Sequence, residues 1–149
     1  MLQKLPYLPT GKEILTVPET DTFMKAAKMV AQTLSRDPEH PTGAVIVLEG
    51  QIIGRGANGS DYHAEHGCKR KELKIPTGEK YELCPGCDPK NHAEQTALKN
   101  CTESPKGADL YLWGHWWCCE SCWGKMIQAG IKNVYLLEGA SEKFNLKRN

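Results

Sequence analysis

Two short motifs constrain this chain more than any other feature. They are His92-Ala-Glu94 and, further along, Cys119-Glu-Ser-Cys122. Together they supply one imidazole, two cysteine sulfurs and one carboxylate that need not bind a metal. An imidazole and two thiolates hold a zinc ion with a fourth position left for water, whose pKa then falls to about 7. Glu94 is the group that can carry protons to and from that water.

The spacing within each motif indicates how the ligands share one metal. Cys119 and Cys122 are three residues apart, so both lie on one face of a first helical turn. His92 and Glu94 are two residues apart and diverge in mid-helix, but both reach a site that lies off the start of a helix. Two helix N-termini therefore point at one zinc ion, and their partial positive charges favour thiolates.

Hydrophobic periodicity predicts helices and strands in alternation along the chain. After an irregular N-terminal arm over residues 1–18, we expect a helix capped by Thr20 or Asp21 that ends near Ser35. The further expected elements are a hairpin over 43–48 and 51–54, an inserted loop over 59–90, a helix over 92–101, a strand over 108–113, a helix over 119–129 and a strand over 131–137. The last strand, helix and strand imply a parallel crossover.

Composition limits the class of partner. The 149 residues suit a single domain over 1–149, and 19 basic against 18 acidic residues give a net charge of +1. We therefore expect a small-molecule substrate and neither nucleic acid nor membrane as a partner. Without a visible leader or apolar span, and with seven cysteines that suit metal binding better than disulfides, a cytoplasmic protein is expected. A homo-oligomer is expected too.

A second copy of the first motif occurs upstream as His63-Ala-Glu65, followed by a second cysteine pair. The residues after Glu65 cannot continue an apolar helical face, so we assign catalysis to Glu94. The upstream residues instead suit a closed, structural Cys₃His zinc site that orders the 59–90 insertion. Its expected ligands are Cys68, Cys84, Cys87 and either His63 or His66.

A different class of protein also fits part of this pattern. The two C-x-x-C pairs, Cys84–Cys87 and Cys119–Cys122, can share one zinc as a non-enzymatic Cys₄ ribbon-like binding module. That interpretation leaves His92 and Glu94 without roles. Metal counting separates the two, because the ribbon binds one zinc ion and the catalytic interpretation asks for two.

With these residues, the chain resembles the cytidine and deoxycytidylate deaminase superfamily, and within it the deoxycytidylate (dCMP) branch. The resemblance covers roughly Thr42 to Leu137. It rests on Gly54-x-Gly-x-Asn58-Gly-Ser, Gly67-Cys-Lys-Arg70, residues 78–84, His92-Ala-Glu94-Gln and residues 125–135. It implies a three-layer α/β/α cytidine-deaminase-like fold of the α/β class, with a mixed central sheet of four to five strands. It also implies that His92, Cys119 and Cys122 hold zinc, that Glu94 shuttles protons, and that Asn58 bonds the substrate's sugar.

The chain departs from the family pattern in three places. Cys118 stands where the family has a proline before the first ligand cysteine, so it can compete as a ligand. The turn before it, Trp113-Gly-His-Trp-Trp117, is about two residues longer and more aromatic than usual, and His115, Trp116 and Trp117 are candidate substrate contacts. Finally, only residues 138–149 remain for the family's last helix and strand, so the sheet can be one strand short.

The expected function is zinc-dependent hydrolytic deamination of a cytosine nucleotide or nucleoside to its uracil form. Attack by the activated water at C4, with Glu94 carrying the protons, releases ammonia. The same chemistry serves guanine, pterin-like and other amino-heterocycles, and these remain the alternative substrates.

Overall fold

One mixed sheet organises the chain. The structure, a computed structural model, describes residues 7–60, 69–74 and 89–144. Its five strands are β1 (Leu15–Val17), β2 (Gly43–Leu48), β3 (Gln51–Ala57), β4 (Asp109–Trp113) and β5 (Asn133–Leu137), in the order β1-β5-β4-β2-β3. β5 pairs in parallel with both β1 and β4, whereas β2 pairs antiparallel with β4 and β3. The parallel crossover expected around α5 (Glu120–Ala129) is confirmed.

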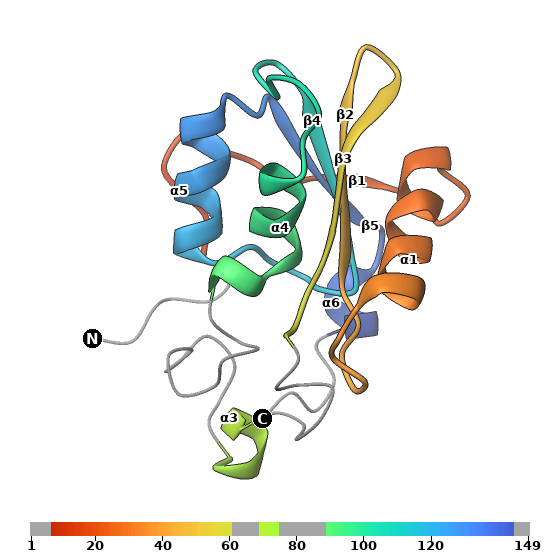
Figure 1. The fold of residues 1–149 in the computed structure, drawn as a ribbon, viewed down its shortest axis with the longest axis vertical. Helices are drawn as coiled ribbons and strands as arrows, with labels where there is room; N and C mark the ends of the chain where they lie inside the picture. The colour runs from red at the N-terminus through yellow and green to blue at the C-terminus, as the bar shows by residue number, and fades with distance from the viewer. Residues whose placement is uncertain (1–6, 61–68, 75–88, 145–149) are drawn as a thin grey trace.

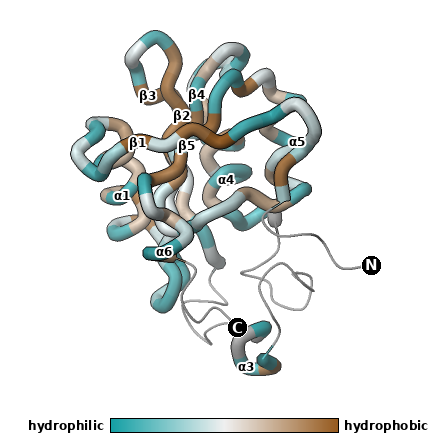
Figure 2. Tube along the Cα trace, turned by 180° about the vertical axis from the view of Figure 1, so that it is seen from behind, coloured by the Kyte–Doolittle hydropathy of each residue, from teal (hydrophilic) through white to brown (hydrophobic). Residues whose placement is uncertain are grey.

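Helices cover both faces of the sheet, as the three-layer α/β/α prediction requires. α4 (Ala93–Lys99) and α5 lie on one side, and α1 (Thr22–Leu34) lies on the other (Figure 1). β2 is buried along nearly its whole length, and apolar residues concentrate along the strands while the outer turns are hydrophilic (Figure 2). The core therefore lies on both faces of β2 and β4.

Helix α1 begins where the sequence places it. Asp21 is its N-cap, and the carboxylate accepts hydrogen bonds of 2.9 Å from the backbone N–H groups of Phe23 and Met24. Its C-cap is Ser35. Within the described residues, no helix is both long and apolar enough to span a bilayer.

Glycines in the hairpin let the helices approach the sheet. A Cβ on Gly43 would lie 2.3 Å from the Ala27 carbonyl oxygen of α1, and one on Gly56 would lie 2.2 Å from the Ala97 nitrogen of α4. Such distances exclude any side chain unless the helix moves. The end of α4 is tied to the same strand, because Asn100 Nδ2 donates a 2.9 Å hydrogen bond to the Arg55 carbonyl. The position of α4 thus depends on β3.

Two expectations for the strands are wrong. Part of the supposed irregular arm, Leu15–Val17, is the edge strand β1, so the sheet has its fifth strand, drawn from the N-terminal side. A three-residue strand is too short to show a period, and its partner lies at the other end of the sequence. The second hairpin strand runs to Ala57 rather than ending at Gly54, because its glycines serve close helix packing and not a turn.

Most of the 59–90 insertion lies outside the described residues. Within it the structure describes a short helix, α3 (Lys69–Glu72), and the start of a 3₁₀ turn, η3 (Pro89–Asn91), that leads into α4. After β5 the chain continues into the short helix α6 (Ala140–Phe144), whose Phe144 ring packs edge-on against Trp113 at 5.0 Å. The sheet therefore gains no strand from the residues described after β5.

We predict that Gly56→Ala destabilises the fold by about 1–3 kcal/mol, because α4 must move away from β3. Gly124→Ala is the matched control. Gly124 lies in α5, and a Cβ added to it would meet nothing within 4 Å, so alanine there should stabilise the fold by up to about 1 kcal/mol. Urea unfolding of both variants measures the difference. Equal stabilities would show that α4 does not depend on this close approach.

Candidate active site

The three expected metal ligands meet where two helices begin. His92 is the N-cap of α4 and Cys119 is the N-cap of α5, both with extended backbones. Cys122 lies in the first turn of α5, and its backbone N–H points at the Cys119 sulfur across 3.5 Å. A sulfur thus takes the capping role that Ser or Asp usually fills. Both helix N-termini face the cluster, as predicted.

The donor atoms are spaced for one small cation. His92 Nδ1 lies 3.6 Å from Cys119 Sγ and 3.5 Å from Cys122 Sγ. In a tetrahedral zinc site with ordinary bond lengths, neighbouring nitrogen and sulfur ligands are about 3.6 Å apart. All three donors lie within 4.8 Å of one another, and both cysteines are buried. The residues present therefore fit zinc, with a fourth position left for water.

The two cysteines ionise very differently without a cation. A hydrogen bond from the Cys122 thiol, helped by His92 and opposed by burial, lowers the pKa of Cys119 far below that of an ordinary thiol. The same hydrogen bond, together with burial, raises the pKa of Cys122. The pair therefore holds on to one proton, which a bound metal replaces.

Glu94 is buried beside this cluster. Its side chain is 5% exposed, and desolvation by burial raises its pKa, an effect that His92 opposes and Cys119 reinforces. Glu94 is not among the cluster's three ligand residues. A carboxylate with a raised pKa is suited to accept and return a proton. The role of Glu94 as proton carrier stays a prediction.

Cys118 does not compete as a ligand in this structure. It is fully buried and lies outside the His92–Cys119–Cys122 cluster. Its thiol hydrogen-bonds the Glu94 carboxyl group, and burial followed by the Glu94 charge raises the Cys118 pKa. The residue that replaces the family's proline therefore contacts the proposed proton carrier.

The aromatic turn is held together by His115. Its Nδ1 accepts hydrogen bonds from the backbone N–H groups of Trp116 at 2.9 Å and Trp117 at 3.3 Å. Trp117 is 3% exposed and packs in the core, whereas Trp116 is half-buried. Both indole N–H groups are buried without a partner among the described residues. Substrate contacts by these three residues stay a prediction.

Asn58 holds the loop between α1 and β2. Its Oδ1 accepts hydrogen bonds from Ser35 Oγ at 2.5 Å and from the Thr42 backbone at 2.9 Å, while Nδ2 donates to the His40 carbonyl at 2.9 Å. These bonds use both acceptor positions of the amide and one of its two donors. The expected sugar contact is left with a single N–H, and it remains a prediction.

The residues of the expected second metal site fall in the insertion. His63, His66, Cys68, Cys84 and Cys87, like Glu65, lie outside the described residues. Within the described ranges, His92, Cys119 and Cys122 form the cluster of side chains that could hold a metal ion.

One neighbour of the cluster was given no role by the sequence. Gln95, the residue after Glu94, donates its side-chain N–H to Ser121 Oγ at 3.0 Å and to Cys122 Sγ at 3.6 Å. Its spacing of three residues from His92 would have placed it on the same face of α4.

A His-Cys-Cys cluster with two buried cysteines, a partly buried histidine and an adjacent carboxylate, on a three-layer α/β/α sheet, is the arrangement typical of zinc hydrolases that activate water. Comparison with protein families identifies the family of the chain. Residues 18–138 match the model described as the cytidine and deoxycytidylate deaminase zinc-binding region. The chain belongs to this family.

Two individual proteins illustrate the similarity. ComE operon protein 2 of Bacillus subtilis (strain 168) is 32% identical over 119 residues, which are 78% of this chain and 57% of that protein. The chain thus spans little more than half the length of this curated relative. The crystal structure of dCMP deaminase from the cyanophage S-TIM5, in complex with dCMP and dUMP, is 28% identical, with a TM-score of 0.53 and 76% of each chain covered.

We predict that Cys119→Ala loses the metal and that Cys118→Pro keeps it, because Cys119 alone of this pair belongs to the ligand cluster. Turnover should vanish in the first variant. In the second it should fall by no more than about tenfold, the value of one hydrogen bond to Glu94. Zinc content by elemental analysis and the rate of ammonia release measure both. Zinc lost from the Cys118 variant and retained in the Cys119 variant would shift the ligand register by one residue.

Proposed function

We propose that the protein is a zinc-dependent hydrolytic deaminase that converts a cytosine nucleotide or nucleoside to its uracil form and releases ammonia. The observation that carries the proposal is the buried Glu94 carboxyl group beside the His92, Cys119 and Cys122 donors. A ligand set that leaves a coordination position for water, next to a carboxylate outside the set, is the combination that hydrolytic attack on a ring carbon requires.

Glu94 carries the protons of the reaction. A zinc ion held by these three residues would supply a water molecule with a pKa lowered to about 7. Glu94 accepts one proton from that water as the oxygen–C4 bond forms, and delivers it to ring nitrogen N3. It then transfers the second proton from the new hydroxyl to the exocyclic amine as the C4–N bond breaks. The products are the 4-keto ring and ammonia.

A small nucleotide or nucleoside is the proposed substrate class. The similar cyanophage enzyme is a dCMP deaminase solved with dCMP and dUMP, and the near-neutral charge of this chain gives no general attraction for a polynucleotide. Asn58 has one amide hydrogen for a sugar hydroxyl. The indole N–H groups of Trp116 and Trp117 are buried, so their contact with a base or phosphate oxygen requires the aromatic turn to move. His115 shapes the same turn.

A substrate panel tests this class. Cytidine, deoxycytidine, CMP and dCMP, set beside guanine and a pterin, are assayed by ammonia release. We expect turnover confined to the cytosine compounds. Release from guanine or the pterin instead would replace the cytosine assignment while leaving the deaminase chemistry in place, and no release from any compound would contradict the enzyme itself.

We predict that Glu94→Gln lowers turnover by about 10²–10⁴-fold, because an amide cannot accept the proton from water. The zinc content should stay at the wild-type level, since Glu94 is not a ligand. The matched control is Glu65→Gln in the upstream copy of the motif, which should leave turnover largely intact. Activity lost in the Glu65 variant and kept in the Glu94 variant would mean that the upstream triplet is catalytic.

We further propose a second, structural zinc held by Cys68, Cys84, Cys87 and one of His63 and His66. Protein purified without chelator should contain about two zinc ions per chain, the sum of one catalytic and one closed Cys₃His site. Cys84→Ser should remove one ion and increase cleavage by protease within residues 59–90. A single zinc ion in fully active protein would eliminate this site.

A further inference from the structure

We propose that Gln95 is a positioning residue for the metal centre, whose side-chain amide holds the Cys122 thiolate by an N–H···S hydrogen bond. The inference rests on the zinc site of the proposed function. Gln95 Nε2 lies 3.6 Å from Cys122 Sγ and 3.0 Å from Ser121 Oγ, so one amide group contacts two consecutive residues of the first turn of α5.

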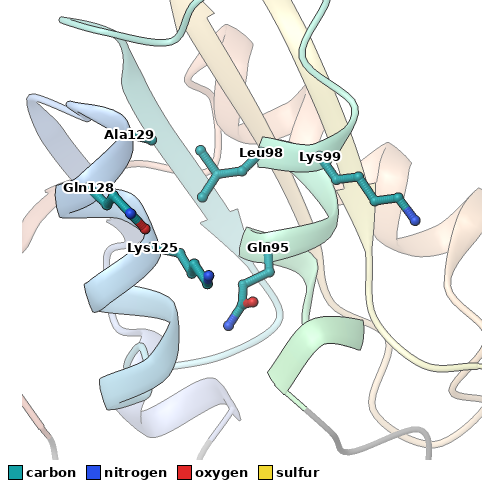
Figure 3. A pocket seen from close by; sticks show the side chains of 6 residues that line it. All are labelled: Gln95, Leu98, Lys99, Lys125, Gln128 and Ala129. Carbon is teal, nitrogen blue, oxygen red and sulfur yellow. The ribbon is translucent and has the colours of Figure 1, made fainter.

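Gln95 connects the two helix starts from which the site is built. It lies three residues after His92 in α4, so one face of that helix presents a metal ligand and, one turn later, the amide. The partners of the amide come from α5. In Figure 3, Gln95 extends from α4 into the space between the helices, where Lys125 of α5 extends toward it. The amide thus ties the two ligand-bearing turns directly to each other.

Among the residues that the structure describes, each cysteine sulfur of the cluster receives one N–H donor that does not belong to a metal-ligand atom. Cys119 Sγ receives the Cys122 backbone N–H at 3.5 Å, and Cys122 Sγ receives the side chain of Gln95. The 3.5 Å contact of Cys122 Sγ with His92 Nδ1 joins two ligands and disappears as a hydrogen bond when both bind one metal. Cys122 is fully buried, and a buried thiolate needs a donor because it has lost its water. Gln95 supplies that donor.

The hydrogen bond from Gln95 is expected to strengthen metal binding through its effect on the charge of the sulfur. A donor to a metal-bound thiolate fixes the sulfur's orientation and draws negative charge away from it, and outer partners of this kind contribute about 10–100-fold to metal affinity. The donor to Cys119 is a backbone N–H, so it does not depend on the side chain at position 95. The Cys122 donor is a side chain, so this half of the arrangement depends on the residue at position 95.

The surroundings of Gln95 allow a substitution that changes only the hydrogen bond. A cavity of about 360 Å³ between α4 and α5 is lined by Gln95, Leu98, Lys99, Lys125, Gln128 and Ala129. Methionine matches glutamine in length and has room there without clashing with either helix. Glutamate matches it in shape and replaces the N–H donor with a negatively charged oxygen.

The experiment compares Gln95→Met, Gln95→Glu and Gln128→Met with the wild type. Gln128 lines the same cavity but is solvent-exposed and two turns from the start of α5, so its variant controls for the loss of any glutamine from this cavity. The zinc dissociation constant is measured by competition with a chelator. The cobalt(II)-substituted proteins are compared by their thiolate-to-cobalt charge-transfer absorption, which reports the charge on sulfur and needs no turnover.

We expect zinc to bind about tenfold more weakly in Gln95→Met, and more weakly still in Gln95→Glu, with a shifted charge-transfer band in both. Gln128→Met should match the wild type. Wild-type affinity and an unshifted band in both Gln95 variants would overturn the proposal, as would an equal loss in the Gln128 variant. These readouts are independent of substrate, so absent deamination with intact metal effects would contradict only the proposed function.

Discussion

Helices α4 and α5 begin side by side, and every chemical property of the site depends on that junction. The N-cap of each helix supplies a donor of the candidate metal site, His92 in one and Cys119 in the other. A helix start offers unpaired N–H groups and a partial positive charge, which stabilise thiolates. Two starts at one point concentrate this effect where the cysteines must lose their protons.

The sheet holds the junction through unusually close packing. β3 approaches the backbone of α4 at Gly54 and Gly56, and β4 leads directly through the aromatic turn into α5. Because interiors are close-packed, a displacement of either helix is transmitted to the ligands at its start. The 3.5–3.6 Å spacings between His92 Nδ1 and the two sulfurs therefore reflect how the whole hairpin and crossover pack.

Burial changes the protonation behaviour of the site. Glu94 and Cys118 are shielded from solvent together, and the thiol is a hydrogen-bonding partner of the carboxyl group. Desolvation raises the pKa of Glu94, which suits the proton-carrying role proposed for it. Gln95 and the Cys122 backbone, for their part, direct N–H groups at the two sulfurs. Glu94 and the two cysteine sulfurs thus each have hydrogen-bonding partners of their own.

The sequence by itself predicted the candidate metal donors, the proposed proton carrier and the order of most elements, because these depend on local spacing: a pair of cysteines one turn apart, a histidine two residues before a glutamate, and a capping residue at Thr20 or Asp21. Only the tertiary structure decided which residues surround them. Leu15–Val17 became a strand through β5, the glycines of β3 proved to be helix-packing positions, and Asn58 proved to fasten the loop before β2. The contacts of Cys118 with Glu94 and of Gln95 with Cys122 likewise join separate segments. Such contacts follow from long-range packing, which leaves no period or spacing in the residues that make them.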